Sequence, residues 1–141
     1  MSQVSIPDPI LLQVEKPSRY IGGEVNSVMK DPSNTPVRIA FCFPDVYDLG
    51  LQLLYGDFNQ MPNVYCERAF APWPDMEQKL RENHIPLYTL ETFTPIREMD
   101  FVAFTLQYEM SFTNILNMLD LAGIPLYAAD RGDNDPLIIA G

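Results

Sequence analysis

One short stretch decides the fold class: Val37-Arg38-Ile39-Ala40-Phe41-Cys42-Phe43, which ends at Pro44. A short, mostly apolar run rich in β-forming residues is typical of a strand buried on both faces of a sheet. Apolar residues then recur at helical spacing, and they predict an amphipathic helix: Leu51, Leu54, Tyr55, Phe58 and Met61. The stretch therefore predicts a buried strand that leads into a helix.

The same alternation continues toward the C-terminus. Further strands are predicted at residues 64–70, 87–90, 101–106 and 137–140. Asp75 with Gln78 resembles a capping box at the start of one helix. Ser111 and Gly123 bound another, whose expected buried face consists of Phe112, Ile115, Leu116, Leu119 and Ala122. Strands that alternate with helices form a parallel sheet covered on both faces. We expect a doubly wound α/β fold with a mainly parallel five-stranded sheet, in the flavodoxin-like order 2-1-3-4-5.

Residues 1–36 differ from the rest, because they are rich in proline and contain the Gly22–Gly23 pair. They predict a lead-in with one short helix, residues 10–15, and a small hairpin over residues 19–25. The domain organisation is therefore a lead-in, 1–36, followed by a Rossmann-like domain, 37–141. Since the sequence stops on a run typical of a buried strand, we expect that domain to be truncated at its C-terminal end.

Composition narrows the partners of this chain. Nine Lys and Arg against nineteen Asp and Glu give a net charge of −10, which disfavours direct binding to nucleic acid. Neither a long apolar run nor a signal peptide is recognisable, so we expect no membrane partner and a cytoplasmic location.

The sequence points to no catalytic or metal-ligating residue. Cys42 and Cys66 lie in apolar runs and are interpreted as buried thiols without a function. His84, the one histidine, follows a predicted helix at the edge of the sheet where the strands begin, and we interpret it as a surface residue. A nucleophile with a neighbouring base is not recognisable.

A binding site is expected at the opposite edge, because ligands of open α/β sheets bind beyond the carboxyl ends of the strands. Aromatic and acidic side chains converge there, and aromatic rings stack on flat ligands. The alternative is that the acids, Asp75 among them, cap helices and that Trp73 packs on another domain. The candidate cofactor-binding residues are Asp45, Tyr47, Asp48, Gly50, Trp73, Gln107, Tyr108, Glu109 and Gly141.

Several long blocks of the sequence resemble one family. They are Arg19-Tyr20-Ile21-Gly22-Gly23-Glu24, Phe43-Pro44-Asp45-Val46-Tyr47-Asp48-Leu49-Gly50 and Phe70-Ala71-Pro72-Trp73-Pro74-Asp75-Met76-Glu77, with residues 104–109 and 114–126. Over residues 17–141 the chain resembles uncharacterised radical S-adenosylmethionine (SAM) proteins with an amino-terminal B12-binding-type domain. The resemblance implies a catalytic barrel in cis, which would hold a [4Fe–4S] cluster and SAM outside this chain, and a cobalamin in this domain.

The sequence departs from the family at one point. Where the family carries a short segment with a histidine, Gly50 runs directly into Leu51. The resemblance therefore implies a cobalamin held by loops alone, without a histidine ligand from this domain.

Two functions follow from these observations. The first is an accessory cobalamin-binding-type domain of a radical SAM enzyme, not catalytic by itself. The alternative is a vestigial Rossmann-like module without a cofactor, which serves in docking or structure. A flavin mononucleotide carrier fits less well, because the loop after the first strand lacks a phosphate-binding cradle rich in Ser, Thr and Gly.

Overall fold

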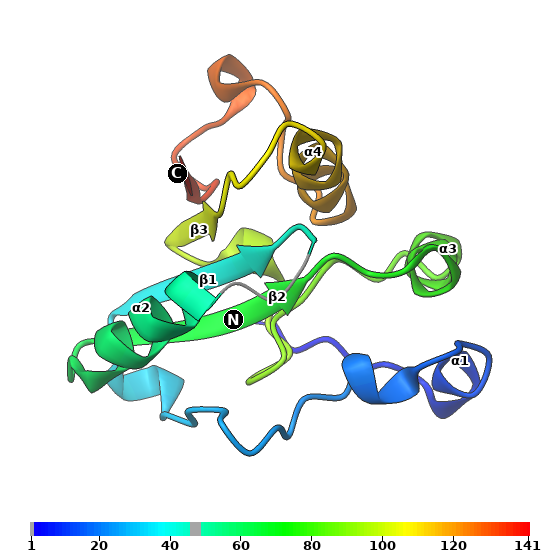
Figure 1. The fold of residues 1–141 in the computed structure, drawn as a ribbon, viewed down its shortest axis with the longest axis horizontal. Coiled ribbons are helices and arrows are strands. Elements are labelled where there is room, and N and C mark those ends of the chain that lie inside the picture. The colour runs from blue at the N-terminus through cyan, green and yellow to red at the C-terminus, as the bar shows by residue number, and fades with distance from the viewer. Residues whose placement is uncertain (1, 46–48) are drawn as a thin grey trace.

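The computed structural model describes residues 2–45 and 49–141, and its centre is a four-stranded parallel sheet (Figure 1). In sheet order the strands are β2 (Val64–Phe70), β1 (Val37–Phe43), β3 (Phe101–Phe104) and β4 (Leu137–Ala140). Each strand is parallel to its neighbours. The fold is thus α/β with a parallel sheet, and this order is compatible with a flavodoxin-like fold.

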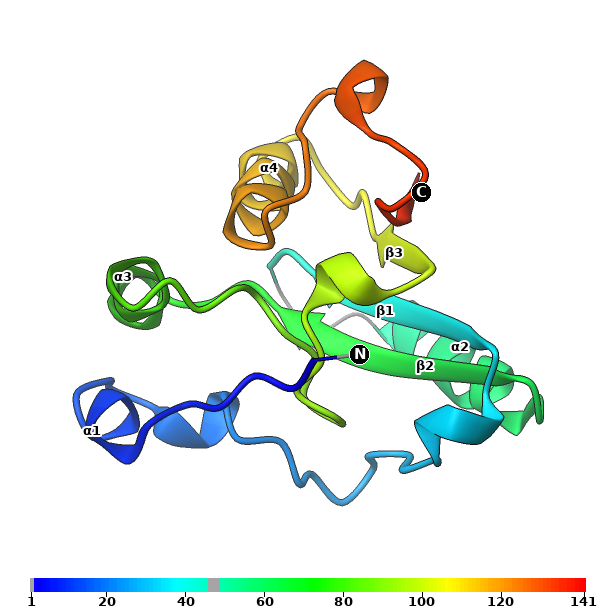
Figure 2. The same ribbon diagram turned by 180° about the vertical axis from the view of Figure 1, so that it is seen from behind.

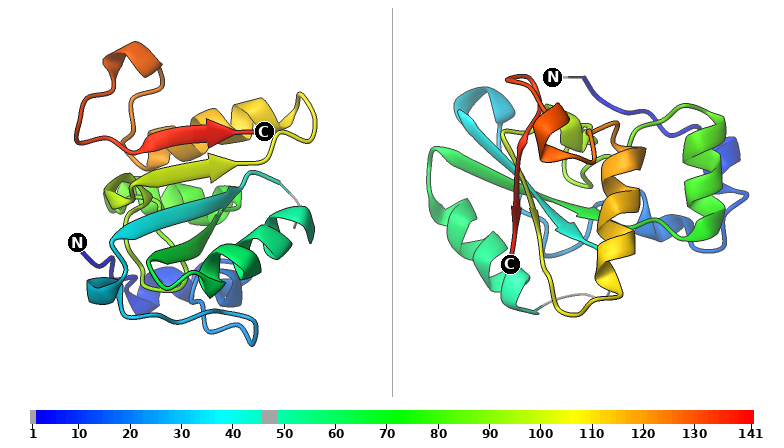
Figure 3. Two further views of the ribbon diagram at one scale, coloured as in Figure 1. Left: turned by 90° about the vertical axis from the view of Figure 1, so that its left-hand side faces the viewer. Right: turned by 90° about the horizontal axis from the view of Figure 1, so that it is seen from above.

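Helices cover both faces of the sheet. Helix α2 (Leu49–Gln60) lies on one face, and α3 (Pro74–Glu82) and α4 (Ser111–Leu121) lie on the other (Figure 3). The short helix α1 (Asp8–Leu11) lies beside α3, as Figures 1 and 2 both show. Single 3-10 turns complete the structure at Pro17–Arg19, Pro32–Asn34, Ile96–Glu98 and Ala128–Asp130. In the described residues no helix is long and apolar enough to cross a membrane.

The prediction for the central strand is confirmed. β1 has parallel partners on both sides, and the side chains of Ala40 and Cys42 are fully buried. One face of the sheet packs on Met76, Leu80, Ile115 and Met118 from α3 and α4. The other face packs on Leu51 and Tyr55 from α2. Two small cores therefore flank a sheet whose central strand contributes to both.

The expected strand at residues 87–90 is wrong, and the sheet has four strands rather than five. These residues form a tight turn with the next ones, held by the Thr89 N–H, which donates to the Thr94 carbonyl (2.9 Å). Phe93 has a φ of 56°, in the left-handed region, which a strand does not allow. The turn lies along the outer edge of β2, where the Leu90 N–H donates to the Arg68 carbonyl (2.8 Å).

Helix α4 is rotated from the expected orientation. Ile115, Leu119 and Ala122 are buried as expected, but Phe112 and Leu116 are half-exposed, while Met118 and Leu121 are buried instead. The helix ends as predicted at Gly123, whose φ is 69° and whose neighbour Ile124 donates to the Leu119 carbonyl (2.9 Å). This rotation leaves an apolar flank on α4.

The lead-in is less regular than expected. Its helix spans Asp8–Leu11 rather than residues 10–15, and residues 19–25 contain no strand. Gly22 has a φ of 63°, and a Cβ there would collide with the carbonyl of Leu90. The segment therefore packs on the turn beside β2 and does not fold back as a hairpin.

Candidate functional site

An apolar groove of about 650 Å³ lies between α2 and the half of the sheet that α2 leaves uncovered. Leu51 and Leu54 of α2 form one wall. Ala103 of β3 and Ile139 of β4 line the sheet side, and Ile139 is 51% exposed. Among the described residues that line the groove none is charged, and Thr105 has the one polar side chain. A volume of this size suits a small-molecule site.

The groove opens at the carboxyl edge of the sheet, where two of the candidate residues meet. Gly50 at the start of α2 and Gly141 after β4 both line it. We call this end of the groove its mouth. The structure thus brings together two loops that lie about ninety residues apart in the sequence.

Three further candidates lie in the connection from β3 to α4, and Gln107, Tyr108 and Glu109 are all exposed there. The connection is anchored at both ends. Leu106 donates its N–H to the Gly141 carbonyl (3.0 Å), and Ser111 donates its hydroxyl to the Tyr108 carbonyl (2.7 Å). These candidates therefore lie next to the mouth of the groove.

The loop after β1 contains the next group of candidates. Asp45 is exposed at the end of β1, and the carbonyl of Pro44 before it accepts a hydrogen bond from the Asn114 amide (2.9 Å). This bond ties the end of β1 to α4. Tyr47 and Asp48 lie outside the described residues.

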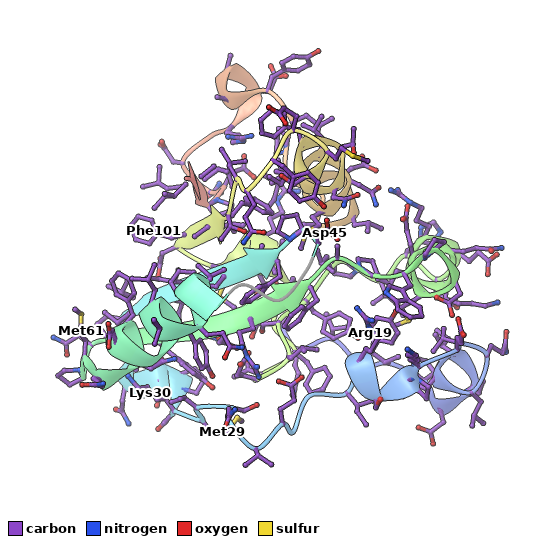
Figure 4. All side chains as sticks on the ribbon, in the orientation of Figure 1. Arg19, Met29, Lys30, Asp45, Met61 and Phe101 are labelled. Atoms are coloured by element: carbon purple, nitrogen blue, oxygen red, sulfur yellow. The ribbon has the colours of Figure 1, made fainter. Side chains whose placement is uncertain are left out.

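Trp73 lies apart from the groove and contacts the lead-in. The Arg19 guanidinium and the Lys16 ammonium lie over its ring, at 4.3 and 4.8 Å from the centroid. Its backbone N–H donates to the Tyr20 hydroxyl (3.2 Å). In Figure 4, Arg19 lies on the lead-in below α3 and apart from Asp45 at the end of β1. Trp73 is therefore held by cation–π contacts within the chain.

Asp75 also binds the lead-in instead of forming the expected capping box. Its carboxylate accepts from the Glu15 N–H (2.8 Å) and from the Met76 N–H (2.8 Å), while α3 has no side-chain cap at Trp73. The Glu15 bond, helped by the Met76 N–H and by Arg19, lowers the pKa of Asp75. The acid therefore joins the lead-in to α3.

We expect Asp75→Ala to loosen the lead-in without unfolding the sheet. The Glu15 amide loses its acceptor, so it should exchange with solvent faster, while amides of β1 should not change. Because the folded-state pKa of Asp75 is depressed, its contribution is present above the unfolded pKa and lost as pH falls through the folded one. Amide exchange at two pH values checks this, and equal exchange of Glu15 in both proteins would contradict it.

Two buried ion pairs involve residues of β2, and the sequence analysis did not predict them. Glu67 is fully buried and accepts from Arg38 Nε (2.9 Å) on β1, and Arg38 is 3% exposed. On the opposite face Arg68 Nε donates to Glu91 (2.7 Å), which also accepts from the Tyr55 hydroxyl (3.0 Å). The one sequence signal was the presence of charged residues inside apolar strand runs. These pairs hold the turn over the edge of β2.

Cys42 and Cys66 are buried and His84 is exposed, as the sequence indicates. Burial raises the pKa of Cys42 well above its usual range and that of Cys66 to about 12, so both thiols stay protonated at neutral pH. The described residues contain no cluster of three potential metal ligands. His84 is exposed just after α3, away from the groove.

Most of the residues that line the groove fall within a family match. The model of the N-terminal region of radical SAM proteins matches residues 50–141, from the start of α2 to the end of β4. No curated protein and no solved structure matches the chain. Since the match covers more than half of the sequence, the chain belongs to the family of radical SAM proteins, whose N-terminal region it carries.

Proposed function

We propose that this chain is the accessory domain of a radical SAM enzyme and that it holds a cobalamin at the carboxyl edge of its sheet. The observation that carries the proposal is the apolar groove, which opens between the loops after β1 and β3. In open α/β sheets this point, where the strand order reverses, is the usual ligand site. Residues 1–36 would act as the packed lead-in and residues 37–141 as the Rossmann-like domain, in a cytoplasmic protein.

The residues at the groove suit the parts of a cobalamin. Its nucleotide tail ends in a flat, apolar base, which matches a groove lined by Leu51, Leu54 and Ile139. Its corrin ring carries amide side chains, for which Gln107 and Glu109 offer hydrogen-bonding partners at the mouth. His84, the one histidine, lies at the other edge, so this chain supplies no imidazole to the cobalt.

The radical chemistry belongs to the rest of the parent protein. The family implies a [4Fe–4S] cluster and SAM there, in a radical SAM domain on the same polypeptide. Such clusters are ligated by cysteine thiolates. This chain has two cysteines, both buried, so it is not the part that binds the cluster.

Hydroxocobalamin titration of the parent protein, followed by visible absorbance, tests the proposal. Ala103→Trp places a large ring in the groove, and we expect it to weaken binding about tenfold or more. His84→Ala serves as the control and should bind like the wild type. The isolated chain should bind weakly, because a ring enclosed by two domains loses contacts when one is removed.

Equal affinity of wild type and Ala103→Trp would contradict the groove as the site. Failure of the parent protein to bind cobalamin would favour the second candidate, a docking module without a cofactor. The observation behind that candidate is the scarcity of polar groups in the groove, where Thr105 alone offers a polar side chain among the described residues.

A further inference from the structure

Strand β4 has the sequence of a buried strand, but it lies at the exposed edge of the sheet. Its sequence, Leu137-Ile138-Ile139-Ala140, is entirely apolar, as in strands buried on both faces of a parallel sheet. Yet Leu137 is 64% and Ile139 51% exposed, both on the half of the α2 side of the sheet that α2 leaves uncovered. Central strand β1, with a similar composition, is largely buried. A strand of the interior type thus lies at the edge of the sheet.

The outer edge of β4 also has unpaired backbone groups. The amides of Leu137 and Gly141 donate to β3, to the carbonyls of Asp100 (2.9 Å) and Phe104 (3.2 Å). Because amides alternate in direction along a strand, those of Ile138 and Ala140 point outward. Long apolar edges of this kind are normally covered, paired or blocked by charge.

The flank of α4 on this side is apolar as well. Asn117 faces α3, where its amide donates to Glu77 (2.9 Å), and Asp120 accepts from the long side chain of Arg81 (2.8 Å). At 100° per residue, Phe112 and Leu116 lie about 140° and 100° from Asn117 around the helix axis. They are 49% and 47% exposed. The helix beside β4 therefore offers a second apolar surface next to the open edge.

We propose that the rest of the radical SAM polypeptide adds a β-strand to the outer edge of β4 and packs on the flank of α4. The family places this chain at the N-terminal side of a radical SAM domain, so the partner is held on the same polypeptide. Such tethering gives an effective concentration in the millimolar range, which a second copy of the chain does not reach. The inference rests on the family and on β4, and it needs no cobalamin.

Amide hydrogen exchange of the parent protein, measured without cobalamin, tests the proposal. The outward amides of Ile138 and Ala140 should exchange at least about a hundredfold more slowly than in an unstructured peptide. The inward amides of Leu137 and Gly141 provide the internal reference for β4. Rapid exchange at Ile138 and Ala140 alone would overturn the added strand. Protection that grows with protein concentration would overturn it too, because it would indicate pairing of two copies.

Two substitutions separate this surface from the groove. Leu137→Lys and Phe112→Lys change exposed side chains that do not line the groove, so the domain itself should still fold. Both should reduce the protection of Ile138 and Ala140, while cobalamin affinity provides a separate readout for the groove. Leu12→Lys, at an 84% exposed position on the lead-in, is the matched control and should have no effect. Unchanged protection in both variants would contradict the proposal.

Discussion

Replacing Glu67 with alanine is expected to lower the free energy of unfolding by about 3–5 kcal/mol, because it leaves the Arg38 guanidinium buried without its counterion. Glu67 is fully buried, and besides Arg38 it accepts from the Thr89 hydroxyl (2.9 Å) and the Thr92 N–H (3.2 Å). Groups on β1 and in the turn beside β2 therefore lose a partner together. Urea denaturation followed by circular dichroism measures the change.

Two controls accompany that experiment: one tests whether burial of the pair matters, and the other tests whether the unpaired charge causes the loss of stability. Glu77→Ala removes one of the two carboxylate partners of Arg81 at the surface and should cost at most about 1 kcal/mol. The double variant Arg38→Met/Glu67→Leu removes both charges and should recover most of the loss, since apolar pairs often replace buried ion pairs without cost. A double variant as unstable as Glu67→Ala would show that the charge left behind is not the cause.

Arg68→Met should destabilise the domain by a similar amount, about 3–5 kcal/mol near neutral pH, through the carboxylate that it leaves behind. Burial raises the pKa of Glu91, and Arg68 opposes that rise. Without Arg68 the folded-state pKa should lie further above the unfolded value. The folded state then binds a proton that the unfolded state releases, so stability is lost as pH rises through the folded pKa.

We therefore predict that Arg68→Met lowers the free energy of unfolding less in mild acid than in mild base. Urea midpoints of wild type and variant at about pH 5 and pH 8 give the difference, since an unperturbed Glu titrates near 4.3. Arg68→Met/Glu91→Gln replaces the carboxylate with a neutral amide and should remove the pH dependence. A loss independent of pH in the single variant would mean that Glu91 is not the group responsible.

The fold was predictable where its determinants are local. The short apolar run at residues 37–43 is enough to predict a buried strand. Gly123 ends α4, as expected of a residue that readily adopts a positive φ. Residues 87–90 were misassigned because their conformation depends on distant partners. Glu67 and Arg68 of β2 bind the turn, and the left-handed Phe93 has no signature in the sequence.

The site was predictable in position but not in character. Ligands of open α/β sheets bind at the carboxyl ends of the strands, and this rule indicates the edge where Gly50 and Gly141 line the groove. The apolar groove depends on how much of the sheet α2 covers, and the spacing of apolar residues in the sequence does not predict this. Trp73 was grouped with the site because its loop follows β2. Two cations of the lead-in, more than fifty residues away in the sequence, lie over its ring instead.

The turn that covers β2 has a consequence for synthesis on the ribosome. Every group that closes this edge, from the lead-in to Thr94, precedes β3 in the sequence. Translation proceeds from the N-terminus at about 5–20 residues per second, so these groups emerge before β3 and β4 do. The growing polypeptide can therefore cover the outer edge of β2 before β3 and β4 are synthesised. Among the described strands, β4 alone then remains open to association with neighbouring nascent chains.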